Sequence, residues 1–207
     1  MQFETGRIYH IFNQGNNRRK IFFKRENYPF FLKKIRLNIL PYSDILAWCL
    51  MPNHFHLMVL VNHLELNVEN THRVTSSHPV SPNPVSNNPR TFNQSIAIML
   101  RSYTRAINKQ QKTSGALFRE STKAECVNCI DGITPSFLIS QGITYINHSE
   151  PEKQYPQFCF DYIHNNPIKA GLVNDINNWE FSSASDYYGI RNGTLINKSV
   201  TKEYLNF

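Results

Sequence analysis

Alternating apolar positions mark the predicted strands of this chain. Four short segments are rich in β-branched, aromatic or other apolar side chains and are predicted to be extended: residues 7–12, 45–48, 55–61 and 115–119. The second and third are predicted to pair through a turn at Met51-Pro52-Asn53. Along the third, His54 and His56 fall on the face opposite to Phe55, because successive side chains of a strand alternate.

Helical spacing of apolar positions predicts the helices. They are expected over residues 26–40, 94–111 and from 158 to about 165, with an uncertain short one around 137–145. The third should end near Pro167, because the residue before a proline avoids the α region.

Two stretches interrupt this pattern. Residues 71–93 are rich in Pro, Ser and Asn, which indicates a long loop or an insertion, and residues 126–156 are largely unassigned. We expect a single domain over residues 1–190 with these two interruptions, followed by a polar tail over 191–207 whose last residues are disordered.

His54 and His56 form the first candidate for chemistry. Side chains at positions i and i+2 of a strand point the same way, so both imidazoles can converge on one metal ion. The alternative is a pair of histidines that merely belong to a sheet. The apolar run over residues 57–61 anchors the strand in a core, which favours the metal interpretation because a rigid strand supports a precise site.

Tyr162 is the second candidate. A helical tyrosine is usually a packed residue with its hydroxyl at the surface, and that alternative stays open. Asn166 lies on the same helical face if the helix persists that far, and its amide oxygen is then a candidate third ligand. His10 and His164 are further histidines whose distance from this site the sequence does not define.

The motifs around these residues resemble a known family. Residues 51–59 read Met-Pro-Asn-His-Phe-His-Leu-Met-Val, and residues 162–173 read Tyr-Ile-His-Asn-Asn-Pro-Ile-Lys-Ala-Gly-Leu-Val. They resemble the REP-associated tyrosine transposases, within the single-tyrosine HUH transposase superfamily. Shorter matches add to the resemblance at residues 9–17, 115–118 and 179–183. It therefore extends from about residue 6 to 190, outside the two interruptions.

The resemblance implies a fold and a set of roles. The fold is α+β and ferredoxin-like, an antiparallel sheet with helices packed on one face and the histidine pair on a central strand. Tyr162 matches the tyrosine that becomes linked to DNA, His54 and His56 match the metal ligands, and Asn166 matches an amide-type ligand.

The implied activity is that of a metal-dependent DNA transposase and endonuclease. It would cleave and rejoin single-stranded DNA near hairpins through a 5′-phosphotyrosine, and a homodimer is possible. Mg²⁺ prefers oxygen ligands and imidazole suits softer ions, so we expect Mg²⁺ or Mn²⁺ to support the reaction.

Charge agrees with a nucleic-acid partner. The 207-residue chain has a formal charge of +7 and a pI near 9.3, which favours nucleic acid first and an anionic membrane second. Some cations are predicted to bind DNA phosphates, although each of them fits a solvated surface as well. They are Arg18, Arg19, Lys20, Arg101, Arg105, Arg119 and Lys123.

The cysteines and termini complete the sequence-based expectations. Four cysteines are too few for a disulfide framework, so we expect reduced thiols, and the pair Cys126 and Cys129 lacks the second pair that a structural zinc needs. No apolar run of about 18 residues and no secretory pattern is present, which predicts a cytoplasmic protein without a membrane span.

Two rival functions stay open. One is a catalytically inactive protein that binds DNA hairpins, and the other is a His-x-His metal hydrolase that acts without a covalent step. The hydrolase predicts that Tyr162→Phe keeps activity, whereas the inactive binder predicts binding without metal-dependent nicking.

Overall fold

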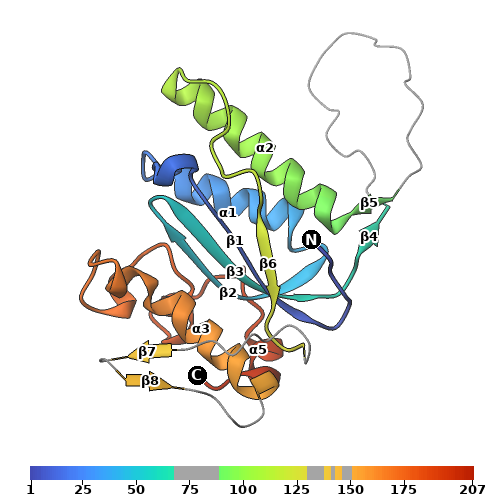
Figure 1. Cartoon of the computed structure of the whole chain (residues 1–207), viewed down its shortest axis with the longest axis vertical. Coiled ribbons are helices and arrows are strands. Elements are labelled where there is room, and N and C mark those ends of the chain that lie inside the picture. The colour runs from blue at the N-terminus through green and yellow to red at the C-terminus, as the bar shows by residue number, and fades with distance from the viewer. Residues whose placement is uncertain (68–88, 130–137, 141–142, 146–150) are drawn as a thin grey trace.

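The centre of the protein is an antiparallel sheet. The structure is a computed structural model and describes residues 1–67, 89–129, 138–140, 143–145 and 151–207 (Figure 1). The four strands lie in the order β2-β3-β1-β6, and each neighbouring pair is antiparallel. Their bounds are Ile8–Gln14 for β1, Ser43–Met51 for β2, His54–Val61 for β3 and Lys123–Cys126 for β6.

Helix α1 (Asn27–Asn38) connects β1 to β2, and helix α2 (Phe92–Gln111) connects β3 to β6. The order βαββαβ, with the first and third main strands at the centre of the sheet, is the ferredoxin-like arrangement. The predicted α+β class is therefore confirmed. A two-stranded ribbon of β4 (Glu65–Leu66) and β5 (Arg90–Thr91) precedes α2.

Alternation along β3 creates two hydrophobic cores, one on each face of the sheet. Phe55 and Leu57 pack toward α1 and α2, together with Phe31 and Tyr103. The opposite face, which contains Met58, packs against α3 (Pro151–Lys169) and the residues around α5 (Lys198–Tyr204). Figure 1 shows α1 and α2 together on one side of the sheet, as expected, and α3 on the other.

The edge strand and two C-terminal segments differ from the sequence-based expectation. Residues 115–119 are not a strand, since they make only an isolated bridge between Phe118 and Gly15, and the sheet's fourth strand is β6. The uncertain helix around 137–145 is wrong for the described part, where β7 (Leu138–Ser140) pairs with β8 (Ile143–Tyr145). Most of 71–93 lies outside the described residues, and its last residues form β5 and begin α2.

Helix α3 also continues past the expected end. Pro167 lies inside it, and the helix ends at Lys169, two residues before Gly171, which has a positive φ of 66°. Hydrogen bonds from Gly171 N to Ile168 O and from Leu172 N to Pro167 O close the terminus, as glycine allows after a helix. The consequence is that Asn166 stays in helical register with Tyr162.

The segment after α3 folds back onto β2. It contains η3 (Ile176–Asn178), α4 (Ala184–Tyr187) and α5, and Leu50 N donates to Phe181 O at 2.8 Å. The expectation of a disordered tail end was wrong, because Leu205 is 4% exposed and packs in the second core. The apolar side chain of Leu205 was the missed signal.

Two further expectations concern thiols and membranes. Cys126 and Cys129 form a disulfide, so the expected reduced state is wrong for this pair, while Cys49 and Cys159 are free and buried. In the described part of the chain, no helix combines the length and apolar character needed to cross a bilayer.

Candidate active site

Three histidines meet on the sheet face that α3 covers. His54 and His56 come from β3, and His10 comes from the neighbouring strand β1. The register pairs Phe12 with His56, so His10 lies diagonally across from His56 on the same face. The rings of His10 and His56 are stacked with centroids 5.0 Å apart, and those of His54 and His56 are 4.9 Å apart.

The δ nitrogens of the two β3 histidines are held by neighbouring side chains. His56 Nδ1 lies 2.8 Å from His10 Nε2, and His54 Nδ1 lies 2.7 Å from Asn53 Oδ1. His56 Nε2 is buried and has no hydrogen-bond partner among the described residues. A buried polar atom without a partner is costly, so this nitrogen is a strong candidate for binding an external group.

Tyr162 lies against this cluster from helix α3. Its ring centroid is 5.5 Å from that of His56 and 6.1 Å from that of His10, with edge-on geometry in both pairs. The side chain is 42% exposed, which leaves the phenol accessible to a ligand. Lys169 Nζ lies 5.2 Å from the centre of the Tyr162 ring, one face of which it covers.

Asn166 lies one helical turn beyond Tyr162 and reaches the same place. Its Nδ2 donates to Tyr162 O at 3.0 Å, which fixes the orientation of the amide. A side-chain contact with Asn166 also partly opposes the lowering of the pKa of His54 by burial. The helix therefore presents a phenol and an amide to the two β3 histidines.

Burial keeps these imidazoles neutral. Desolvation lowers the pKa of His10 to about 4 and lowers the pKa of His54. Desolvation also lowers the pKa of His56 well below its ordinary value, and the repulsion that His10 and His54 would exert when protonated adds to the effect. Neutral imidazoles expose lone pairs near pH 7, which is the form that binds metal ions.

The residues present fit a divalent metal ion. Across the described ranges, no group of three or more His, Cys, Asp or Glu side chains is placed to hold a metal, so any site here has a different composition. His54, His56 and Asn166 offer two imidazoles and one amide. The unpartnered Nε2 of His56 is the observation that supports this use, since each ligating imidazole needs one free nitrogen and a partner on the other.

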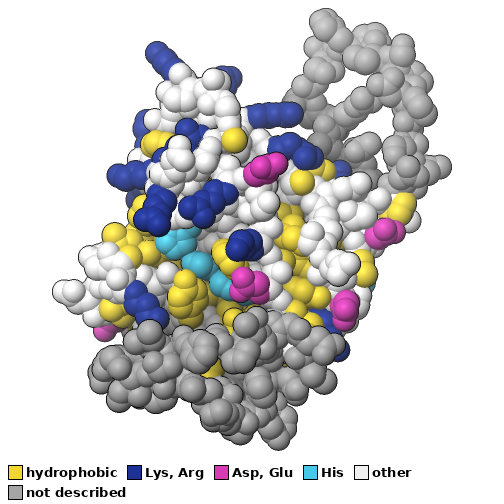
Figure 2. Space-filling view, viewed as in Figure 1, with side chains coloured by type: hydrophobic (Ala, Val, Ile, Leu, Met, Phe, Trp, Pro, Cys, Tyr) yellow, Lys and Arg dark blue, Asp and Glu magenta, His cyan; other side chains and the backbone are white. Residues whose placement is uncertain are grey.

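A cleft opens beside the cluster. It has a volume of about 220 Å³, and its lining includes His54, His56 and Tyr162 with two predicted DNA-binding cations, Arg119 and Lys123. Figure 2 shows histidine side chains reaching the surface on this face, with Lys and Arg side chains close by. The cleft thus combines a phenol, imidazoles and positive charge, which suits an anionic ligand.

The other predicted cations lie outside this cleft. Arg101 and Arg105 line a larger groove beside α2. Arg18, Arg19 and Lys20 lie next to the β2–β3 turn, where Ile21 N donates to Pro52 O at 2.9 Å. All of these are exposed.

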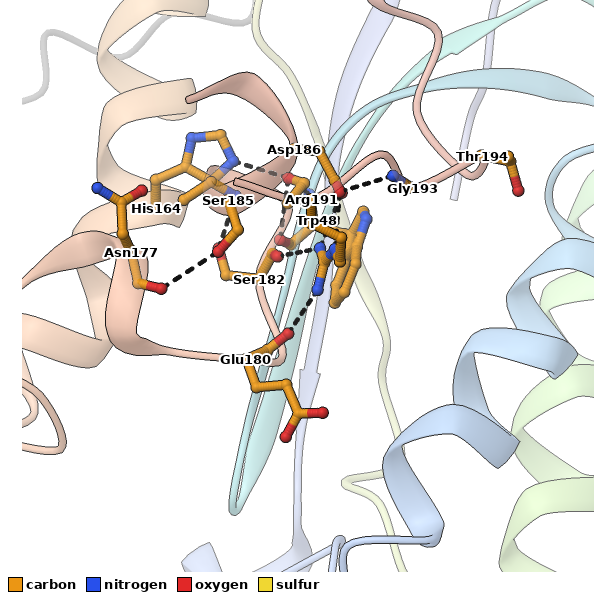
Figure 3. A network of polar contacts seen from close by, with 12 residues as sticks. Trp48, His164, Asn177, Glu180, Ser182, Ser185, Asp186, Arg191, Gly193 and Thr194 are labelled. Atoms are coloured by element: carbon orange, nitrogen blue, oxygen red, sulfur yellow. Dashed lines mark hydrogen bonds and ion pairs between the residues drawn. The ribbon is translucent and has the colours of Figure 1, made fainter. Parts of the chain in front are cut away.

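His164 points away from the cluster. Its Nε2 lies 2.7 Å from Ser183 Oγ, in a buried polar network that joins α3 to the segment around α4 (Figure 3). Of the two histidines that the sequence left open, His10 therefore belongs to the site and His164 does not. The signal for His10 was its position on the strand next to the histidine pair.

Comparisons with known proteins define the fold class. No family model matches the chain, and no curated protein matches it. A solved structure of a REP-associated tyrosine transposase bound to a REP hairpin has a similar fold, with a TM-score of 0.52 at 13% identity. The match covers 96% of this chain and 95% of that chain. This similarity establishes a shared fold.

Proposed function

We propose that this protein is a metal-dependent DNA transposase of the HUH type. It cleaves single-stranded DNA near a hairpin and rejoins strands through a covalent bond between Tyr162 and the DNA 5′ phosphate. The observation that carries the proposal is the contact between Tyr162 and His56, whose buried Nε2 has no partner among the described residues.

Tyr162 acts as the nucleophile in this account. Its oxygen forms a bond to the phosphorus while the bond from phosphorus to the 3′ oxygen breaks. The departing 3′ oxygen takes up a proton, and the phenol loses one. The strand is left with a free 3′ hydroxyl and a 5′-phosphotyrosine, so the energy of the phosphodiester is conserved and a second 3′ hydroxyl can reverse the step.

In this account, residues in and beside the cleft would hold the substrate and a metal ion. His54, His56 and Asn166 would hold a divalent ion such as Mg²⁺ or Mn²⁺, which when bound offsets negative charge at the scissile phosphate. A phenol has a pKa near 10 and is a weak nucleophile at pH 7, so this charge compensation matters. Arg119 and Lys123 line the cleft and attract the phosphate.

DNA as the partner is supported from two sides. Arg119 and Lys123 line the cleft, with further Lys and Arg side chains on the same face of the molecule, and the protein of similar fold is bound to a REP hairpin. A homodimer and a cytoplasmic location remain predictions from the sequence. The same holds for the single domain over residues 1–190.

The experiment that tests the proposal uses a pool of labelled hairpin oligonucleotides with randomised flanks, because the target sequence is undefined. Wild type, Tyr162→Phe and His56→Ala are incubated with Mg²⁺, Mn²⁺ or EDTA and run on a denaturing gel. We expect a metal-dependent protein–DNA adduct with the wild type, and none with either variant.

Other outcomes favour the rival functions. Hairpin binding without nicking by the wild type points to an inactive binding protein. Nicking that survives Tyr162→Phe points to a His-x-His hydrolase in which water is the nucleophile. Tyr204→Phe is the matched control, because Tyr204 is similarly exposed (40%) on α5 and should leave adduct formation unchanged.

A further inference from the structure

A second concave surface lies beside helix α2. It runs between α2 and residues 115–122, has a volume of about 700 Å³, and is called the α2 groove below. The partly exposed Ala97 and Leu100 contribute apolar atoms, and polar groups from Thr104 and Thr122 join them. This combination of apolar and polar lining differs from a plain cationic surface.

The wall opposite α2 is fixed by hydrogen bonds. Asn16 N donates to Leu117 O at 2.9 Å, and Arg119 N donates to Gln14 O at 2.9 Å. From the other side, Asn108 Nδ2 of α2 donates to Gly115 O at 2.8 Å. Residues 115–119 are therefore held against both β1 and α2 without being a strand, so the groove is a built feature.

The charge in the α2 groove is positive. Arg101 and Arg105 are one helical turn apart on α2, about 6 Å along the axis, and Arg119 projects from the opposite wall. Glu120 is the single carboxylate among the lining residues. Within the described ranges, none of these three arginines forms an ion pair with a carboxylate, so their charges are available to an anionic ligand.

The groove is continuous with the active-site cleft. Asn13, Arg119 and Ser121 line both of them. Asn13 also stabilises this junction, because its Nδ2 donates to Thr122 Oγ1 at 2.8 Å and to Arg119 O at 3.2 Å. A chain of phosphates leaving the cleft beside Tyr162 would therefore meet Arg119 first and then the arginines of α2.

We propose that the α2 groove binds the single-stranded DNA that flanks the cleavage point, with Arg101, Arg105 and Arg119 contacting its phosphates. The proposal rests on the proposed function, since it takes single-stranded DNA as the substrate of the cleft. Figure 2 shows Lys and Arg side chains on the surface beyond the histidines.

A single strand fits the groove better than a duplex does. Single-strand sites combine a cationic groove that follows the backbone with apolar or aromatic surfaces that contact the bases. The α2 groove has both, because the partly exposed side chains of Ala97 and Leu100 lie among the arginines in its lining. A duplex stem hides its base faces in stacking and has no use for an apolar lining.

The test measures how a single-stranded flank contributes to binding. Three labelled oligonucleotides share one palindromic stem and carry no flank, a 5′ flank or a 3′ flank of mixed sequence. Binding to wild type and to Arg101→Gln/Arg105→Gln is measured by fluorescence anisotropy across a range of salt. Both arginines are exposed, and a thermal melt of the variant confirms that it is folded.

We expect the double variant to lose affinity only for a flanked oligonucleotide. Each phosphate contact to a single strand contributes about 0.7 to the slope of log affinity against log salt. Removing two contacts lowers that slope by about 1.4, which corresponds to a roughly 25-fold weaker affinity at ~0.1 M salt. Binding of the flankless stem should change little. Lys24→Gln/Lys33→Gln is the matched control, with the same charge change at exposed positions that line neither cavity.

Each outcome decides the proposal. An equal loss for the flanked and flankless oligonucleotides would overturn it, because the groove would then hold the stem. No loss of affinity for any oligonucleotide, or an equal loss of affinity in the control variant, would overturn it as well.

The adduct assay is scored separately on the same proteins. If affinity falls only for a flanked oligonucleotide while the wild type forms no Tyr162 adduct, the α2 groove still binds the flank but the proposed cleavage chemistry is wrong.

Discussion

At the scale of single residues, His10 determines which nitrogen of His56 is available. The atoms His56 Nδ1 and His10 Nε2 lie 2.8 Å apart, and one proton is shared between them. If His56 donates it, its Nε2 keeps a lone pair that can bind a metal ion. If His10 donates it, the Nε2 of neutral His56 carries a hydrogen and cannot. His10 is thus a positioning residue that must act as the acceptor.

Replacing His10 should therefore weaken metal binding without removing a ligand. His10→Leu deletes the acceptor, and we expect an affinity for Mn²⁺ about 10- to 100-fold lower, as is typical for partners of metal ligands. His10→Gln, which supplies an acceptor oxygen, should retain more of the affinity. Titration calorimetry with Mn²⁺ measures it. His164→Leu is the control, because His164 is also buried but contacts Ser183 instead of His56. An unchanged Mn²⁺ affinity in His10→Leu would exclude the positioning role of His10.

Lys169 should affect the reaction through the orientation of the Tyr162 ring. Its Nζ lies 5.2 Å from the ring centre, a contact worth about 0.5–1 kcal/mol at an exposed site. We expect Lys169→Met to slow adduct formation by about two- to fivefold in single-turnover reactions. Lys202→Met is the matched control, since Lys202 lies over Phe207 and neither residue lines the cleft. Equal rates for the two variants would argue against an effect of Lys169.

At the scale of elements, a polar network holds the segment after α3 against β2. Asp186 is 1% exposed; it accepts from Arg191 Nε at 2.7 Å, Arg191 Nη2 at 2.8 Å and Gly193 N at 2.9 Å (Figure 3). Arg191 also donates to Glu180 O at 2.7 Å. The neighbouring Ser183 bonds both Trp48 of β2 and His164 of α3, so the segment links the sheet to the helix that carries Tyr162.

Removing the Asp186 carboxylate should destabilise the fold strongly. Loss of one partner from a buried ion pair costs about 3–5 kcal/mol, and we expect Asp186→Ala near the lower end because the Arg191 side chain is 34% exposed. Glu180→Ala breaks the exposed pair with Arg25 and should cost less than about 1 kcal/mol. Urea unfolding measures the free energy of unfolding of both variants. Similar losses of stability in the two would contradict the importance of burial.

The elements that the sequence predicted are those with strong apolar periodicity. Strand β3 and helix α2 were predicted to within a few residues. Strand β3 is a continuous apolar run that is buried on both faces, and the buried positions of α2 recur at a spacing of about 3.6. Strand β6 was missed because it is a short edge strand, in which Lys123 and Glu125 are exposed and the alternating Ala124 and Cys126 are small and only partly buried. The apolar residues of 115–119 suggested a strand instead, but Leu117 and Phe118 are buried as part of a loop wall.

At the scale of the whole molecule, the fold brings together residues that are distant in the sequence. The motifs alone indicated Tyr162, the β3 histidines and Asn166, and the structure places them around one cleft. The approach of His10 and the continuity of the cleft with the α2 groove depend on tertiary packing, which no local pattern encodes. Whether Asn166 shared a face with Tyr162 depended on the helix continuing through Pro167, which it does.

The central claim is that Tyr162 becomes bonded to DNA. The most direct measurement is peptide mapping by mass spectrometry of the adduct formed by the wild-type protein with the hairpin pool and Mn²⁺. The account predicts a nucleotide mass on the peptide that contains Tyr162 and on no other peptide. It predicts no adduct when EDTA replaces Mn²⁺ in the reaction. A nucleotide attached to a different residue, or metal-dependent cleavage without any attached nucleotide, would contradict it.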